Sequence, residues 1–592
     1  MRAASWTGSP SIKGRSEATR MALLAFSLTG VSFTWGVEMS YCTPYLLQLG
    51  LTKSRTSLVW IAGPLSGLII HPLIGVIADR SRSKWGRRRP FMLGGALIVA
   101  FCLLLLGWTS EIVGWFVHDI ERKRSATIAV AVLAIYGVDF AINAAQACCR
   151  SLIVDTLPIS QQQLGSAWAI RMQAIGSLIA YIVGSIDMVT TFGTRFGDTQ
   201  FKQMTVVAAI FLIVSVLITS YSVKERVLIA ARGADETHGF FHVISQLYKT
   251  TMDLPPRIQS ICWVQFWSWI GWFPFLFYST TWVGETYFRY ENPESAASSS
   301  DTLGDVGRLG SLSLVIFSGV TFLSSVLLPF GVRSPDSNSK RANFTSRPPP
   351  RMAAVLRRFK RVRPSLQTAW FLSHLVFAGT MIFAPMARSL KVATFLVSVC
   401  GIPWAVSGWA PFAFMGIEIN KLALEPPSRP TATMITSTTF RTHGYRPIDS
   451  VEPDMEMDVL RLNHRSAGDD DSDAEESSTI ESPSTGELAG IYLGVLNVYT
   501  TLPQFVGTFI SWIVFSILEP ATSSPVGQKQ STPTSDAGET KDHSSARDGG
   551  WMNLDTDAPD AIAVCLFIGA LSALVAAEAT RRFRALRQQS LP

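Results

Sequence analysis

The chain has 592 residues, of which 48% are hydrophobic and 16% are charged, whereas soluble domains carry about 25% charged residues. This composition excludes an ordinary soluble domain. The formal net charge of +7 comes from basic residues in predicted loops and does not indicate a nucleic-acid partner. The seven cysteines lie in or beside apolar runs, without a Cys-x-x-Cys pair or a His/Cys metal spacing, so we expect neither disulfides nor a metal site.

Apolar runs of roughly 20 residues, the length that a helix needs to cross a bilayer, recur along the chain. We count twelve of them, and a polar connection separates the first six from the last six. The sequence therefore predicts an all-α membrane protein with twelve transmembrane helices. The expected spans are 22–47, 56–78, 91–112, 127–149, 166–187, 204–222, 258–281, 310–331, 367–387, 391–415, 488–516 and 559–580.

Three clusters of lysine and arginine set the expected orientation of these helices. They are "DRSRSKWGRRRP" after the second helix, "RMAAVLRRFKRVRP" after the eighth helix, and "RRFRALRQQ" near the C-terminus. Basic loops stay on the cytoplasmic side of a membrane, so we expect both termini there. The short cluster "ERKR" at 121–124 then falls outside, against the rule, but it is smaller than the other three.

The same orientation divides the chain into domains. Residues 418–487 are rich in acid and serine and are expected to be a disordered cytoplasmic loop, and the Ser/Thr/Pro/Gly-rich residues 519–550 an extracellular loop. The full division is a cytoplasmic tail at 1–21, an N-terminal six-helix bundle at 22–222, a cytoplasmic connection at 223–257, a C-terminal six-helix bundle at 258–580 that contains both loops, and a basic cytoplasmic tail at 581–592.

The fourth apolar run contains polar residues, in "YGVDFAINAAQACCRSLIVD". Asp139, Asn143, Gln146 and Arg150 are spaced four, three and four residues apart, which places them on one face of a helix. A charge at membrane depth costs at least about 2.5 kcal/mol, so we expect this face to line a wet cavity between helices. Two alternatives stay open: Asp139 belongs to a structural hydrogen-bond network, or Arg150 only extends to the membrane surface.

The first run also contains an acid, Glu38, in "FTWGVEMSYCTPY". Its short side chain cannot easily reach the membrane surface, and a membrane carboxyl group that takes up protons can carry them. Glu38, Asp139 and Arg150 are therefore the candidate residues for proton coupling. The sequence leaves open which of the two acids takes the proton.

Aromatic residues are frequent, with 17 tryptophans and 34 phenylalanines. A sugar has apolar C–H faces and a rim of hydroxyls, so its site needs rings beside amides and carboxylates, and Trp35 stands one turn before Glu38. Asn497 and Gln504, seven residues apart, share a face of the eleventh helix and are further candidates. The alternatives are interfacial belts for the aromatics and helix packing for the two amides.

The stretch "GVIADRSRSKWGRRRP" resembles the loop between the second and third helices of the major facilitator superfamily. Asp79 ends a helix there, and arginines follow it. We expect Asp79, Arg80, Arg87 and Arg88 to form ion pairs that close the cytoplasmic side and break when it opens.

Longer stretches are similar to the sucrose transporters of plants and, above all, to fungal sucrose and α-glucoside permeases, which are glycoside:cation symporters. They are "TPYLLQLGL", "WIAGPLSGLIIHPLIG", "NAAQACCRSLIVD", "SWIGWFPFLFY", "GIPWAVSGWAPFAF" and "GIYLGVLNVYTTLPQ". The resemblance implies the major facilitator fold and a proton-coupled symporter that imports sucrose, maltose or a related α-glucoside by alternating access. It assigns Asp139 to proton coupling and sugar contact, and Arg150 to coupling and substrate binding.

The chain departs from the plant pattern at three places. Glu38 stands where the plant transporters have glutamine, and Lys53 stands where they have histidine. After the seventh helix the chain reads "STTWVGETY", in which Glu285 is our candidate for the acid of the plant pattern, while the neighbouring arginine is missing. The candidate substrate-binding residues are Trp35, Asn143, Gln146, Arg150, Glu285, Asn497 and Gln504.

No enzyme activity is expected, because the sequence offers no nucleophile, base and oxyanion-binding set and no phosphate loop at a suitable depth. The proton is the expected coupling ion, with no cofactor. The expected partners are a small sugar and the lipid bilayer, with the chain acting as a monomer in the plasma membrane or, alternatively, the vacuolar membrane. A second function stays open, a membrane sugar sensor of the same fold that does not transport.

Overall fold

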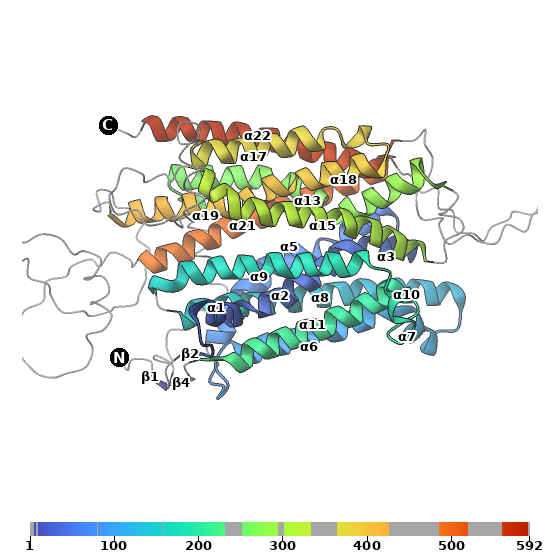
Figure 1. The fold of residues 1–592 in the computed structure, drawn as a ribbon, viewed down its shortest axis with the longest axis horizontal. Coiled ribbons are helices and arrows are strands. Elements are labelled where there is room, and N and C mark those ends of the chain that lie inside the picture. Colours follow the sequence, from blue (N-terminus) through green and yellow to red (C-terminus); the bar gives the residue numbers. More distant parts are fainter. Residues whose placement is uncertain are drawn as a thin grey trace, which may run out of the picture.

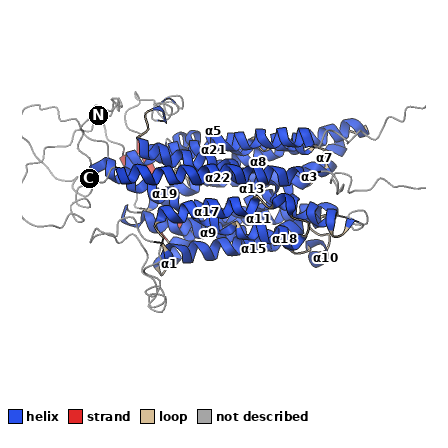
Figure 2. Ribbon diagram, turned by 90° about the horizontal axis from the view of Figure 1, so that it is seen from above, coloured by secondary structure: helices blue, strands red, loops and turns tan. Residues whose placement is uncertain are grey.

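The computed structural model of the chain is almost entirely helical, and its long helices run side by side (Figures 1 and 2). Most of the two long loops expected at 418–487 and 519–550, together with Arg80, lies outside the described residues. The structure describes residues 5–7, 10–79, 81–157, 159–225, 227–230, 245, 251–293, 301–332, 364–424, 485–518 and 559–589.

The N-terminal helices form one group, in which α2 packs on α9 and α11, and α8 packs on α5 and α6. Their bounds are α1 Glu17–Ala25, α2 Ser27–Val37, the π-helical turn η1 Glu38–Cys42, α3 Thr43–Gln48, α4 Lys53–Val59, α5 Ala62–Asp79, α6 Arg89–Gly107, α7 Thr109–Phe116, α8 Ile120–Thr156, α9 Ile159–Ser185, α10 Met188–Phe192 and α11 Gln200–Ser222. We call this group the N-bundle.

The remaining helices form a second group, the C-bundle, in which α13 packs on α15, α21 and α22, and α17 packs on α19 and α22. Their bounds are α13 Pro256–Tyr290, α15 Thr302–Gly331, α17 Leu366–Met381, the 3-10 turn η2 Ala384–Met386, α18 Leu390–Val399, α19 Gly401–Leu424, α21 Thr485–Leu518 and α22 Ala561–Gln589. Four short strands, β1 Ser5–Thr7, β2 Ser11–Ile12, β3 Val223–Lys224 and β4 Val227–Ala230, form two antiparallel pairs, β1 with β4 and β2 with β3.

Eight helical spans of the described residues are long and apolar enough to cross a bilayer, or nine if the bent pair Glu17–Ala25 and Ser27–Gln48 counts as one span. The long helices α5, α9 and α13 run alongside them (Figure 1). Large apolar side chains such as Phe101 and Leu133 are exposed on the outside of the bundles, as lipid-facing residues are. The prediction of an all-helical membrane protein is therefore confirmed.

The first helix is not the single rod expected at 22–47. It bends by 43° after Ala25, and a π-helical turn begins at Glu38. Pro44 has no backbone N–H, so the α-helical hydrogen bond to the carbonyl four residues earlier cannot form, and this loss accompanies the wider turn. Such turns occur most often at functional sites, and this one presents Glu38 at its first position.

Two further spans differ from the sequence prediction. The fourth helix, expected at 127–149, extends over Ile120–Thr156, because the basic cluster at 121–124 continues the helix beyond its apolar part. The tenth, expected at 391–415, is divided into α18 and α19 at Cys400.

Glycines allow close approach where helices cross within each bundle. A Cβ added at Gly176 of α9 would lie 2.2 Å from the carbonyl oxygen of Thr29 on α2. In the C-bundle, a Cβ at Gly271 of α13 would lie 2.6 Å from the carbonyl oxygen of Gly569 on α22. Small residues at such crossings let backbones pack directly, which is how helices associate in lipid.

The two bundles lie side by side along their length (Figure 1). We call the end at which α1 begins and α22 ends the near end, and the opposite end, at which α3, α7 and α10 lie, the distal end. The bundles contact each other mainly through α9 and α15, and through α4 and α21.

Candidate functional site

Two carboxyl groups from different helices meet inside the N-bundle. Glu38 of η1 and Asp139 of α8 are each 1% exposed, and their carboxyl groups lie within hydrogen-bonding reach of each other. Among the described residues no other group donates a hydrogen bond to any of their four oxygens. Two carboxylates are acceptors only, whereas one proton between them lets one group donate to the other.

The surroundings of this carboxyl pair are almost free of charge. The nearest ionisable groups are the thiol of Cys42, one turn along the first helix, and the phenol of Tyr136 on α8. On the α5 side, Gly63 leaves room for the acid, since a Cβ there would lie 4.0 Å from Oδ1 of Asp139. The pair can therefore exchange a proton but has no adjacent base to compensate two negative charges.

Asn143, one turn after Asp139, joins α8 to α5. Its Nδ2 donates to Oγ of Ser66 at 2.8 Å and to the carbonyl oxygen of Asp139 at 2.9 Å. Oγ of Ser66 in turn donates to the carbonyl oxygen of Gly63 at 2.8 Å. This chain of hydrogen bonds fixes the backbone that carries Asp139, and both donors of the Asn143 amide are used in it.

The last two positions of the polar face are more accessible. Gln146 is partly exposed, and Arg150 is exposed although protein surrounds its guanidinium on most sides, as in the wall of an open cavity. His71 of α5 is the titratable group near Arg150. The polar face of α8 therefore passes from a buried end at Asp139 to an accessible end at Arg150, toward the near end.

The C-bundle contributes rings. The rings of Trp272 and Trp404 have centroids 4.8 Å apart, those of Trp269 and Trp404 6.1 Å, and those of Trp272 and Phe377 4.4 Å. Trp272 is buried, whereas Trp269 and Trp404 are partly exposed. In the N-bundle, Trp35 is partly exposed as well.

The two candidate amides on α21 lie close to their own backbone. Nε2 of Gln504 donates to the carbonyl oxygen of Thr500 at 2.9 Å, and the carbonyl oxygen of Asn497 accepts from the hydroxyls of Thr500 and Thr501 at 2.9 and 2.8 Å. Both side chains are partly exposed. They remain able to meet a ligand between the bundles.

Two of the candidate gating residues form ion pairs at the near end. Nε of Arg87 and Nε of Arg88 donate to Oδ2 of Asp155 on α8, at 3.1 and 2.9 Å. The carboxylate of Glu225, after β3, accepts from the backbone N–H groups of Arg87, Arg88 and Arg89 at 2.9 Å each, and so caps the start of α6. These contacts join parts of the N-bundle. The side chain of Asp79 and all of Arg80 lie outside what the structure describes.

Glu285 lies at the distal end, in an ion pair across the two bundles. Its Oε2 is 2.8 Å from Nζ of Lys53, the first residue of α4. Other polar contacts between the bundles gather at the same end. Oγ1 of Thr43 donates to the carbonyl oxygen of Phe277 at 2.8 Å, and Oγ1 of Thr280 donates to that of Met39 at 3.1 Å.

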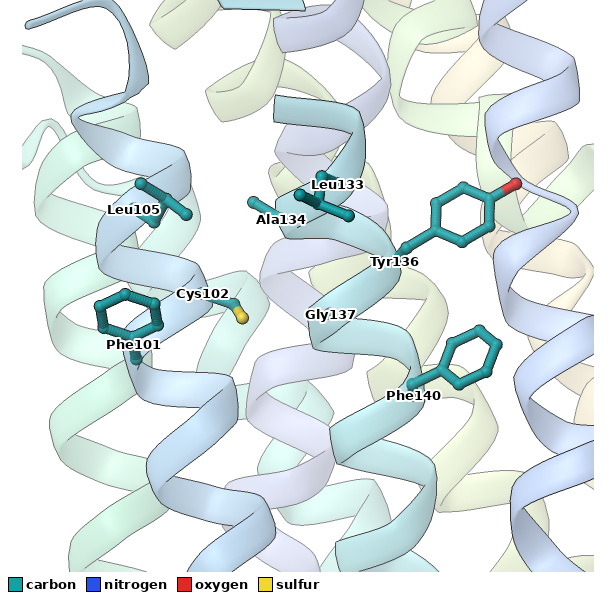
Figure 3. Close-up of a pocket in the computed structure, with 8 residues that line it drawn as sticks. All are labelled: Phe101, Cys102, Leu105, Leu133, Ala134, Tyr136, Gly137 and Phe140. Carbon is teal, nitrogen blue, oxygen red and sulfur yellow. The ribbon is translucent and has the colours of Figure 1, made fainter. Parts of the chain in front are cut away.

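A groove of about 440 Å³ lies between α6 and α8, but its lining does not fit a sugar (Figure 3). It is lined by the side chains of Phe101, Cys102, Leu105, Leu133, Ala134, Tyr136 and Phe140 and by Gly137. These are almost wholly apolar, and several of them are exposed on the outer, lipid-facing surface of the bundle. The groove therefore suits an acyl chain, and the site with the chemistry for protons and hydroxyls is the carboxyl pair and its polar face.

Comparison with known proteins gives one family. Residues 23–251 match the family model described as MFS/sugar transport protein. The general alpha-glucoside permease of Schizosaccharomyces pombe is 32% identical over 467 residues, which cover 71% of this chain and 83% of the permease. Sucrose transport protein SUC4 of Arabidopsis thaliana is 28% identical over 427 residues, which cover 69% of this chain and 80% of that protein.

Solved structures share the fold at lower identity. A bacterial homologue of the human lysosomal transporter Spinster, in an inward-facing and unoccupied conformation, has a TM-score of 0.50 at 12% identity, with 97% of this chain and 96% of that chain covered. The nucleoside transporter NupG likewise has a TM-score of 0.50 at 12% identity, with 95% of this chain and 99% of that chain covered.

Proposed function

We propose that this chain, which belongs to the MFS/sugar transport protein family, is a proton-coupled symporter that imports an α-glucoside such as sucrose or maltose. The family membership confirms the resemblance found in the sequence and makes the chain a membrane transporter of sugars. The observation that carries the coupling is the buried pair of facing carboxyl groups, Glu38 and Asp139.

The carboxyl pair binds one exchangeable proton. Two ionised carboxylates in contact repel each other, and a low-dielectric interior strengthens the repulsion. A proton shared between Glu38 and Asp139 replaces the repulsion with a hydrogen bond. The bundles therefore close around the pair most easily when it is protonated, which links proton uptake to the conformational change.

The transport cycle follows the alternating-access scheme, with the two bundles rocking about a site between them. When the distal end is open, the pair takes a proton from the medium and the sugar binds. After the distal end closes and the near end opens to the more alkaline cytosol, the proton leaves. Arg150, about 16 Å further along α8, then stabilises the ionised pair through the open cavity.

The sugar binds between the bundles. Its hydroxyls contact Gln146 and Arg150 on α8 and Asn497 and Gln504 on α21, and Asn143 keeps α8 in position. Its apolar C–H faces stack on Trp35 and on the partly exposed rings of the C-bundle. The partly exposed rings and amides on facing helices support this arrangement.

The membrane topology that we propose has twelve spans. The long helices α5, α9 and α13, which run parallel to the apolar ones, complete the two sets of six. The basic loops then place the near end and both termini in the cytoplasm. The membrane is the plasma membrane, and one chain supplies both bundles, so a monomer is sufficient.

Transport by the purified chain in proteoliposomes tests the function. With an acidic exterior, we expect labelled sucrose or maltose to accumulate inside and protons to enter with it. A panel of unlabelled sugars should compete in the order of their affinities, with α-glucosides first. A chain that binds these sugars without exchanging labelled sugar across the membrane would be a sensor, and this result would contradict the proposal.

A further inference from the structure

A buried ion pair connects the two bundles at the distal end. Nζ of Lys53 on α4 and Oε2 of Glu285 on α13 are 2.8 Å apart, and their side chains are only 6% and 4% exposed. No helix of one bundle can move away from the other at this point without separating these two charges. The proposed transport cycle requires this separation whenever the distal end opens.

The surroundings of the ion pair make the same end of the interface tight. The hydroxyl of Ser57, one turn after Lys53, is buried beside the phenol of Tyr278 on α13. Ser54 of α4 and Ser516 of α21 join their hydroxyls at 2.6 Å. The whole of α4 is thus held against the C-bundle, with Lys53 at its first position.

A second ion pair at this end differs in burial. Arg308 of α15 pairs with Asp187, which precedes α10, and their side chains are 26% and 37% exposed. Exposed ion pairs contribute little, because water screens them and the side chains lose freedom. Removing one partner of a buried pair is far more damaging, since it leaves an uncompensated charge inside the protein.

We propose that Lys53 and Glu285 are the principal gate on the extracellular side, a buried ion pair that is formed while the distal end is closed and broken while it is open. In the open form water reaches both charges, so each is stable alone. Loss of one charge therefore destabilises only the closed form and shifts the chain toward outward opening. Both are positioning residues for transport, and only the naming of the distal end as extracellular rests on the proposed function.

A cysteine placed at Ser57 reports the gate. In a chain whose seven native cysteines are replaced, Ser57→Cys is treated from outside intact cells with a membrane-impermeant thiol reagent. We expect Lys53→Gln and Glu285→Gln each to raise the labelling rate at least about tenfold. The matched control Arg308→Gln, at the exposed pair of the same interface, should change it less than about threefold.

Three further variants separate the gate from general loosening of the fold. Lys53→Arg keeps the charge and should label at nearly the parent rate. The double change Lys53→Met with Glu285→Leu removes both charges, leaves none buried alone, and should label at the parent rate or more slowly. The exchange Lys53→Glu with Glu285→Lys should restore slow labelling.

The proposal is overturned if the single neutral variants label at the parent rate, or if the double apolar variant labels as fast as they do. If the single variants do not reach the membrane, the decision rests on the exchanged pair, which supports the gate by slow labelling and overturns it by fast labelling or absence. Labelling needs neither sugar nor a proton gradient, so its outcome is independent of the substrate and the coupling ion.

Discussion

The two bundles contribute different chemistry to the space between them. The N-bundle holds the buried acids Glu38 and Asp139, and a polar face of α8 that leads from them to Arg150. The C-bundle holds clustered rings, with Trp404 between Trp269 and Trp272. We infer that proton coupling belongs mainly to the N-bundle and stacking of the sugar mainly to the C-bundle.

This division explains why the acids are fully buried while two of the tryptophans are not. A carboxyl pair binds a proton well when water is excluded, because the shared proton then replaces a repulsion that solvent would otherwise weaken. A ring that stacks on a sugar must be reachable from the cavity. Changes in one bundle should therefore alter coupling and sugar affinity separately, which the following variants test.

The largest effect is expected from Asp139→Asn. An amide cannot be ionised or carry the coupled proton, so accumulation of sugar against its gradient should disappear while exchange of labelled for unlabelled sugar continues. Uptake and counterflow in cells measure the two. The control Asp119→Asn, the same change at the exposed start of α8, should behave as the parent, and accumulation by Asp139→Asn would remove this acid from the coupling.

Glu38→Gln should preserve accumulation but change its pH dependence. The amide donates a hydrogen bond to the ionised Asp139 and removes a like charge, so a higher proton concentration is needed to protonate the acid. Groups coupled this closely interact by about one pH unit or more, and the pH of half-maximal uptake should fall by at least about one unit. An unchanged pH profile would assign Glu38 a structural role.

Trp404→Ala should weaken sugar binding without altering coupling. Aromatic contacts contribute about 0.5–1.5 kcal/mol beyond burial, so KM should rise about three- to tenfold while the pH profile stays the same. Trp115→Ala, at a ring that is 74% exposed on α7, is the control and should leave KM unchanged. A changed pH profile in Trp404→Ala would contradict the division between the bundles.

The smallest effect is expected from Ser66→Ala. Asn143 loses one acceptor, and a typical hydrogen bond contributes about 1 kcal/mol, so the thermal unfolding temperature in detergent should fall by a few degrees while proton dependence is retained. Ser325→Ala removes a hydroxyl that donates within its own helix and should have a smaller effect. Loss of coupling in Ser66→Ala would mean that the link between α5 and α8 takes part in proton transfer.

Much of the fold follows from the length of the apolar runs, because each bilayer-spanning helix satisfies its own backbone hydrogen bonds. The irregular points do not follow. The π-helical turn at Glu38 and the division of a span at Cys400 depend on packing against other helices, and no apolar periodicity indicates them. Only Pro44, six residues after Glu38, gave a local signal that the first helix is irregular.

The candidate site divides in the same way. The spacing of the polar residues on α8 predicts that Asp139, Asn143 and Arg150 share a face, since this is a property of one helix. That Glu38 meets Asp139 depends on the packing of two helices. The same holds for the pairing of Lys53 with Glu285, which the sequence places only as departures from the plant pattern, and for Ser66 and Trp404, which we did not single out. Unpaired charges within apolar runs were the available signal for the first two contacts.

The central claim is that Glu38 and Asp139 together carry the coupled proton. Simultaneous measurement of sugar and proton flux in proteoliposomes tests it most directly, for the parent chain and for Glu38→Gln combined with Asp139→Asn. We predict that protons enter with sugar through the parent chain, and that the double variant exchanges sugar with no accompanying proton. Sugar-dependent proton entry through the double variant would contradict the account.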